Sequence, residues 1–175
     1  MIKLKFNWTL LIIILCTLTM LSSCDDDITP VIPSNSFTVS GGFTADISQG
    51  YLEEFKDNGN GSFAWFLILV SEGFDIQTEG NGSLIDLELN SNSESGLTAG
   101  TYNWSDSSDS FTMVYSEAAV NFDFGTGLGD YHNFNGTGGT VIISFDGADT
   151  IVDFELTMSD GNEVKGYYRG ILEVL

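Results

Sequence analysis

Residues 151–158, Ile-Val-Asp-Phe-Glu-Leu-Thr-Met, contain the pattern that decides the fold class. Every second residue from Val152 to Met158 is apolar, and the residues between them are polar. A period of two residues is typical of a β-strand that buries one face and exposes the other. We therefore expect a half-buried strand here, with Asp153 and Glu155 pointing away from the core.

Turns that contain glycine lie on both sides of this strand. Asp146-Gly147 separates it from the apolar run 141–145, and Asp160-Gly161-Asn162 separates it from residues 164–174. Glycine supplies the positive φ angles that tight hairpins need. The C-terminal part of the chain therefore predicts a three-stranded antiparallel meander.

Similar strands and turns continue toward the N-terminus. Residues 63–70 are apolar on both faces, which favours a central strand covered on two sides. Asp86 and Glu88 alternate with leucines, so we expect both carboxylates to point outward. No stretch after Cys24 has a sustained helical period. We expect about eight to ten strands, namely the final three and those over residues 37–46, 51–55, 63–70, 84–90, 101–104, 111–124 and 131–134.

This pattern of short strands and frequent turns predicts an all-β domain over residues 37–175. An antiparallel β-sandwich and a lipocalin-like β-barrel both fit, and the sequence leaves the choice between them open. The domain is long enough to bury a sizeable core. It contains no cysteine, so its stability must come from that core and not from disulfide bonds.

The first 23 residues have the layout of a secretory signal peptide. Lys3 and Lys5 precede an apolar run over residues 10–15, and small residues follow before Cys24. A membrane-spanning helix needs about 20 predominantly apolar residues, and this run is much shorter. We therefore expect residues 1–23 to be removed on export.

The end of this segment resembles the lipobox of bacterial lipoproteins, because Leu21-Ser22-Ser23 directly precedes Cys24. The resemblance implies that Cys24 is lipidated and becomes the first residue of the mature chain. Residues 24–36 contain both prolines among polar and acidic residues, so we expect an extended acidic tether. The implied partner of the tether is a membrane, through the N-terminal lipid.

Asp25, Asp26 and Asp27 follow the cysteine directly. This acidic cluster resembles the surface-export signal of Bacteroidota lipoproteins, which implies an outer-membrane protein displayed on the cell surface. The serine, lysine or glutamine that usually precedes the acids is missing, so a periplasm-facing position remains the alternative. Three further fragments together resemble a recurring pattern in small secreted Bacteroidota proteins of unassigned activity: 97–102, 138–143 and 161–170. This resemblance implies an extracytoplasmic β-sheet domain and offers no catalytic residues to transfer.

The chain is strongly acidic. Five Lys and Arg residues face 25 Asp and Glu residues, which gives a formal net charge of −20. Loss of Lys3 and Lys5 with the signal would make the mature chain more acidic still. A surface this negative repels phosphate backbones, so we expect no nucleic-acid partner.

The sequence does not predict an enzyme. His132 is the only histidine, and no serine lies in a nucleophile-elbow pattern that this base could serve. Without thiols in the mature chain, a zinc site of the usual type is also excluded. Asp86 and Glu88, if they point outward, lack the apolar pocket that raises the pKa of a catalytic acid.

Two sets of residues are candidates for binding. Aromatic side chains with a polar tip can line a ligand site, and the candidates are Trp65, Trp104, Tyr131, His132 and Tyr167. Hard oxygen donors in two loops suit calcium, which is the possible cofactor, and the candidates are Asp106, Asp109, Asp123 and Asp130.

Three functions follow as hypotheses. A non-catalytic binding module for a glycan, peptide or small apolar ligand comes first, and it predicts a concave patch of convergent aromatic and polar side chains. A structural or accessory lipoprotein of an outer-membrane assembly comes second, and it predicts a flat apolar patch. A hydrolase comes last, and it predicts a buried carboxylate or His132 in a cleft.

Overall fold

The computed structural model describes residues 34–76, 78 and 80–175, and within this part of the chain it is all β with no α-helix. The predicted signal and most of the tether, with Cys24 and Asp25 to Asp27, lie outside the described residues. The twelve strands are β1 (Ser36–Val39), β2 (Phe43–Asp46), β3 (Gln49–Asp57), β4 (Phe63–Val70), β5 (Asn81–Ser91), β6 (Gly100–Trp104), β7 (Thr112–Asp123), β8 (Tyr131–Asn133), β9 (Gly136–Asp146), β10 (Asp149–Met158), β11 (Glu163–Gly170) and β12 (Leu172–Val174).

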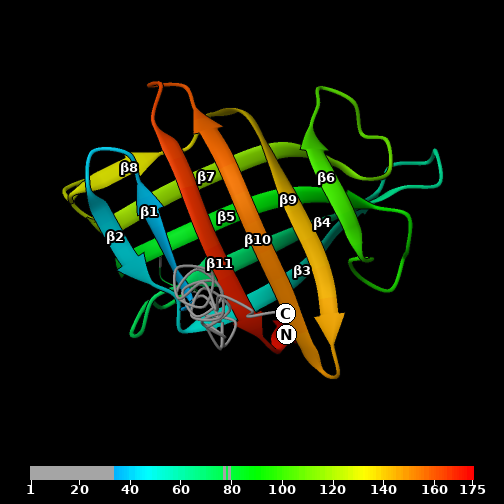
Figure 1. Ribbon diagram of the computed structural model, residues 1–175, viewed down its shortest axis with the longest axis horizontal. Helices are drawn as coiled ribbons and strands as arrows, with labels where there is room; N and C mark the ends of the chain where they lie inside the picture. Colours follow the sequence, from blue (N-terminus) through cyan, green and yellow to red (C-terminus); the bar gives the residue numbers. More distant parts are fainter. Residues whose placement is uncertain (1–33, 77, 79) are drawn as a thin grey trace, which may run out of the picture. The chain divides into compact units, whose positions relative to one another are not determined.

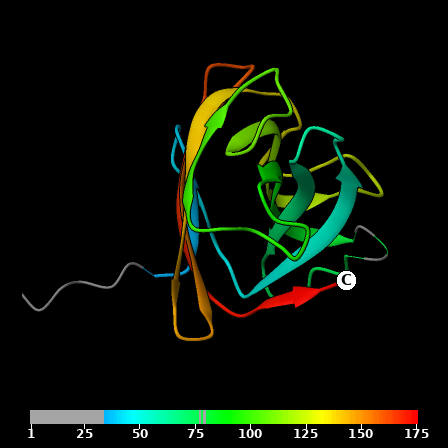
Figure 2. The ribbon, with the colours of Figure 1, turned by 90° about the vertical axis from the view of Figure 1, so that its right-hand side faces the viewer.

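All strands belong to one curled sheet with the order β12-β3-β4-β5-β7-β6-β9-β10-β11-β1-β2, and β8 pairs with β7. The curl folds the sheet into two facing walls (Figures 1 and 2). We call the wall of β9, β10, β11 and β1 the front wall and the wall of β3, β4, β5 and β7 the back wall. The all-β prediction is therefore confirmed, and the curled sheet has the shape of a half-barrel.

The sheet differs from the prediction in two details. The described residues form twelve strands and not eight to ten. One reason is that Gly41 and Gly42, with φ of 102° and 100°, split the expected strand 37–46 into the β1–β2 hairpin. Likewise, β12 leaves the end of β11 and pairs with β3. The sheet is also mixed, since β3 with β12 and β6 with β7 run parallel while the other pairs are antiparallel.

The predicted C-terminal meander is confirmed. Strands β9, β10 and β11 pair antiparallel in sequence, and the turns between them place Gly147 and Gly161 at φ of 65° and 84°. The residues of β10 alternate as expected, with Val152 to Met158 buried at every second position and Asp153 and Glu155 exposed.

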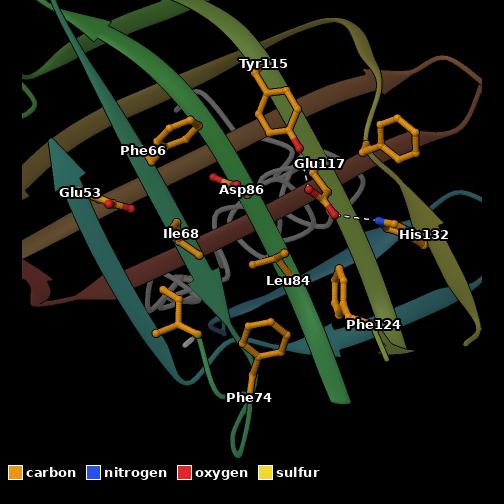
Figure 3. A pocket seen from close by; sticks show the side chains of 12 residues that line it. Glu53, Phe66, Ile68, Phe74, Leu84, Asp86, Tyr115, Glu117, Phe124 and His132 are labelled. Carbon is orange, nitrogen blue, oxygen red and sulfur yellow. Dashed lines mark hydrogen bonds and ion pairs between the residues drawn. The ribbon is translucent and has the colours of Figure 1, made fainter. Parts of the chain in front are cut away.

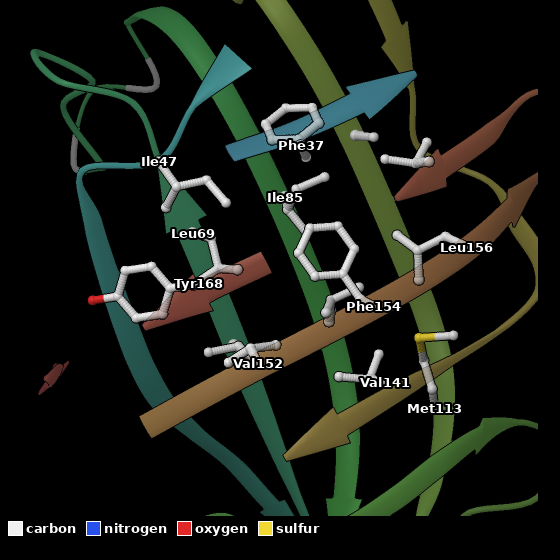
Figure 4. Packing of buried hydrophobic residues seen from close by; sticks show 14 of the residues in the cluster. Phe37, Ile47, Leu69, Ile85, Met113, Val141, Val152, Phe154, Leu156 and Tyr168 are labelled. Atoms are coloured by element: carbon white, nitrogen blue, oxygen red, sulfur yellow. The ribbon is translucent and has the colours of Figure 1, made fainter. Parts of the chain in front are cut away.

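The main core fills the space between the two walls (Figure 4). Phe154 of the front wall packs there and is 1% exposed. A side chain at Gly166 would collide with Phe154 and Phe37, so glycine at this position lets the two rings occupy the centre. Burying a large apolar side chain contributes about 1.5–3 kcal/mol, and the largest fully buried ones are Tyr102, Phe37, Phe154, Leu67, Leu69, Ile85, Leu87, Leu89, Met113, Ile143, Leu156 and Met158.

The back wall also carries apolar residues on its outer face. Leu67 and Leu69 of β4 point into the main core, whereas Ile68 packs against a second cluster on the opposite side. Phe74 and Ile76, which lie between β4 and β5 in the chain, pack in that cluster. Strand β4 is thus covered by a complete wall inside, as predicted, and only in part by loops outside, where Phe66 and Ile68 are half-buried.

Candidate functional site

An open groove lies on the outer face of the back wall and has a volume of about 510 Å³. Figure 3 shows its side chains converging from β3, β4, β5, β7 and β8 and from the adjoining loops. Carboxylates and aromatic rings dominate the lining, so we call it the acid–aromatic groove, formed by Glu53, Phe66, Ile68, Phe74, Ile76, Leu84, Asp86, Tyr115, Glu117, Phe124, His132 and Phe134.

The strand register builds the floor of the groove. One row across the back wall pairs Ile68 with Asp86 and Asp86 with Glu117. Residues directly opposite each other on neighbouring strands share a face of the sheet with Cβ atoms about 5 Å apart. These three side chains therefore stand together on the outer face although β4, β5 and β7 are distant in sequence.

A second row runs parallel to the first. It pairs Glu53 with Phe66, Phe66 with Glu88, and Glu88 with Tyr115. The rings of Phe66 and Tyr115 meet edge to face with centroids 6.4 Å apart. They form an aromatic border beside the carboxylates of the floor.

Asp86 lies in the middle of the floor in an environment that disfavours its charge. Its Oδ1 atom is buried and has no hydrogen-bond partner within the described part of the chain. Burial, and next the negative charge of Glu117, raise the pKa of Asp86 to about 7, although the backbone hydrogen bond at Leu87 opposes this shift. Asp86 therefore changes its charge near neutral pH.

Glu117 is held by two neighbours. The Tyr115 hydroxyl donates a hydrogen bond to Oε2 over 2.6 Å, and Nε2 of His132 lies 2.7 Å from Oε1. Burial and the adjacent carboxylates, Glu117 first, raise the pKa of the Tyr115 phenol above its ordinary value. Tyr115 thus remains a neutral hydrogen-bond donor that fixes Glu117 in the groove.

Aromatic rings form one end of the groove around His132. The imidazole centroid lies 4.2 Å from that of Phe122, 5.3 Å from that of Phe124 and 5.9 Å from that of Phe134. Phe74 meets Phe124 edge to face at 5.8 Å. Rings in such arrangements offer a large apolar surface with a defined shape.

The groove is negatively charged. Glu53, Asp86 and Glu117 line it, and no Lys or Arg is among the described residues that form its lining. Lys56 lies close enough to Glu88 to oppose the rise of the Glu88 pKa that burial causes. The arrangement can accept hydrogen bonds and positive charge while burying an apolar body.

Five aromatic residues were predicted to bind a ligand, and one of them, His132, lines the groove. Trp65 is 4% exposed, and its indole nitrogen donates to the carbonyl of Ser93 over 3.2 Å. Trp104 packs against the main core, and Tyr131 belongs to it. Tyr167 lies on the outer face of β11, the same face as Lys165. Successive residues of a strand point to opposite faces, and its neighbour Tyr168 is buried in the core.

The four predicted calcium ligands are divided between two loops. Asp109 accepts a hydrogen bond from Ser107, and Asp106 is exposed in the same loop. Asp123 accepts from the backbone of its own turn, and Asp130 accepts from Asn121 over 2.8 Å. In the described ranges, no group of three or more His, Cys, Asp or Glu side chains is placed to hold a metal ion. Calcium binding stays a prediction.

The expectation that Asp86 lacks an apolar pocket is wrong. Asp86 does point away from the main core, but the outer face of the back wall is itself apolar, so the carboxyl group is desolvated there. Sequence reasoning also missed Glu53, Phe66 and Glu117 as residues of the site. The signal for this site was the apolar character of residues 63–70 on both faces, because such a strand needs outer neighbours that cover it.

Comparison of the chain with protein-family models, with curated proteins and with solved structures gives no match. The groove is therefore interpreted from its own residues. Over the described residues, no helix is long and apolar enough to cross a membrane.

Proposed function

We propose that the protein is a non-catalytic binding module, tethered by a lipid on Cys24 to the outer membrane of a Gram-negative bacterium and displayed on the cell surface. The acid–aromatic groove is its binding site. The observation that carries the proposal is the groove of about 510 Å³, in which aromatic rings surround a few placed polar groups. Sites for small ligands typically combine these features.

Two alternatives are weaker. An accessory lipoprotein of an outer-membrane assembly would be expected to present a flat apolar patch, whereas polar and aromatic side chains converge in a hollow here. A periplasm-facing orientation remains the alternative for the location.

A hydrolase is the second candidate function, since Asp86 with a pKa of about 7 stands opposite Glu117 on the next strand. Glycosidases use such a pair as acid and base. Both carboxylate oxygens of Glu117, however, already interact with Tyr115 and His132. Because both oxygens are occupied by these contacts, the site favours ligand binding over catalysis. If the protein hydrolysed chromogenic glycosides and Asp86→Asn lost this activity, catalysis would be favoured instead.

Ligand screening of the full chain in detergent tests the binding function. Glycans, short peptides and small apolar molecules are measured by thermal shift, with and without calcium. A ligand of the groove should bind more weakly to Phe134→Ala, because Phe134 lines the groove and is 57% exposed. Phe145→Ala is the matched control, since this ring is 51% exposed on β9. Equal weakening by both variants, or no binding at all, would contradict the proposal.

The anchor is tested separately. Cys24→Ala should move the protein from the membrane fraction to the soluble fraction, because two or three acyl chains anchor a protein far more stably than one or none. Mass spectrometry of the wild type should find acyl groups on an N-terminal Cys24. Protease digestion of intact cells then distinguishes surface display from the periplasm-facing alternative.

A further inference from the structure

We infer that the ligand of the acid–aromatic groove carries a protonated amine on an aromatic body, and that a carboxyl oxygen of Asp86 accepts a hydrogen bond from this amine. The inference rests on the proposed function, because it names the ligand class for the same groove. Three independent observations support it: an unpartnered acceptor, the charge of the lining and the aromatic border.

The unpartnered acceptor is Oδ1 of Asp86, which is buried without a hydrogen bond inside the described structure. A buried acceptor that lacks a donor destabilises the protein. Because Asp86 lines the groove, rotation of its carboxyl group would bring this oxygen to a ligand donor and remove the cost. The register places Asp86 between Ile68 and Glu117, in the middle of the floor. Figure 3 shows the same position, with Phe66 and Tyr115 on one side and Leu84 on the other.

The charge of the lining selects the kind of donor. An ammonium group has three donors and no acceptor, so it matches a groove whose carboxylates are Glu53, Asp86 and Glu117. A neutral alcohol can donate only one hydrogen bond and brings no charge. An anionic ligand would be repelled, since no Lys or Arg is among the described lining residues.

The aromatic border suits the rest of the ligand. Phe66 and Tyr115 stand in the row beside Asp86, so their faces can attract a cation that approaches its carboxylate. Phe74 and Phe124 extend the apolar surface toward His132 and offer contact area for an aromatic body. An amine and its ring would thus be bound by neighbouring parts of one groove.

Ionisation of Asp86 should make binding depend on pH. The titratable groups that face or flank it are Glu53, Glu88, Tyr115, Glu117 and His132. A primary alkylamine stays protonated up to about pH 10, whereas Asp86 loses its proton near neutral pH. Affinity for the amine should therefore increase between about pH 5.5 and 8.

The test uses three probes with the same indole body: tryptamine, indole-3-ethanol and indole-3-propionate. Their dissociation constants for the full chain in detergent are measured by calorimetry at pH 8. We expect tryptamine to bind at least about tenfold more tightly than the alcohol, since a hydrogen bond to a charged group is worth more than a neutral one. The propionate should bind most weakly.

Three variants test whether Asp86 causes the preference for the amine. Asp86→Asn should reduce the ratio of alcohol to amine dissociation constants to about threefold or less, because the charged acceptor is gone. Asp153→Asn is the matched control, since Asp153 is exposed on the outer face of β10 and should leave the ratio unchanged. Glu53→Gln gives a second test that leaves the centre of the floor intact, and it should lower the ratio by a smaller factor.

The outcomes separate this inference from the function on which it rests. Equal binding of tryptamine and the alcohol to the wild type would overturn the amine inference while the groove remained a binding site. The same holds if Asp153→Asn lowers the ratio as much as Asp86→Asn does. If none of the three probes binds and the wider screen also finds no ligand, the proposed function fails as well.

Discussion

The two faces of the back wall both carry apolar side chains, but these side chains are covered in different ways. Inside, side chains such as Leu67 and Leu87 are covered by the whole front wall and are inaccessible to solvent. Outside, Ile68 and Leu84 on the same strands are covered only by loops, and carboxylates stand among them. A wall seals its core, whereas loops leave a groove. The difference separates the part of the protein that stabilises the fold from the part available to a ligand.

Truncation of the main core should have the largest effect. Phe154→Ala is expected to lower the free energy of unfolding by about 3–5 kcal/mol, because it leaves a cavity between the walls. Phe134→Ala at the groove, where the ring is 57% exposed, should change it by about 0.5 kcal/mol or less. Urea denaturation of both variants measures the contrast. Similar losses in the free energy of unfolding for the two variants would mean that the groove also stabilises the fold.

Asp86 should make stability depend on pH. Its folded-state pKa of about 7 lies above the ordinary value of 3.8, so the folded protein holds this proton more tightly than the unfolded chain does. The resulting stability is fully present below about pH 4 and is lost as the pH rises through 7. We expect the contribution of Asp86 to lower the free energy of unfolding of the wild type by roughly 2–4 kcal/mol between pH 4 and 8. Asp86→Asn should remove this decrease.

Urea denaturation across this pH range is the measurement. Asp153→Asn, on the exposed face of the front wall, serves as the control and should keep the wild-type pH dependence. If Asp86→Asn also keeps the wild-type pH dependence, Asp86 is well solvated. The outer face of the back wall would then not differ from an ordinary exposed surface.

Glu117 should couple to Asp86 by a smaller amount. Its charge, after burial, raises the pKa of Asp86, so Glu117→Gln should lower that pKa toward its ordinary value without reaching it. Carboxyl-carbon NMR titration follows Asp86 directly. Glu155→Gln, an exposed position of β10, should leave it unchanged. A pKa of Asp86 that stays near 7 in Glu117→Gln would assign the whole shift to burial.

The inner face of the sheet could be predicted from the sequence, and the outer face only in part. Val152 to Met158 alternate strictly, and the structure buries them as that period requires. Residues 63–70 also predicted cover on both sides. The sequence does not indicate what covers the outer side, because that depends on the register between strands distant in the chain.

The site residues were missed for the same reason. Asp86 meets Glu117 only once β5 and β7 are paired, and a register slip of one residue would turn one of them inward. His132 was identified because it is the one histidine of the sequence. Its ring contacts with Phe122 of β7 and with Phe124 depend on the pairing of β7 with β8 and on the connection between them. Trp65 and Tyr131 were chosen for their chemistry and proved to be core residues.

The pairing of β1 with β11 has a consequence for biogenesis. The side chain of Asn35 bonds to the backbone of Arg169, which lies 134 positions further along the chain, and β1 has no place in the front wall until β11 is available. Folds dominated by such distant contacts form slowly. A nascent chain therefore cannot complete the front wall until β11 has been synthesised.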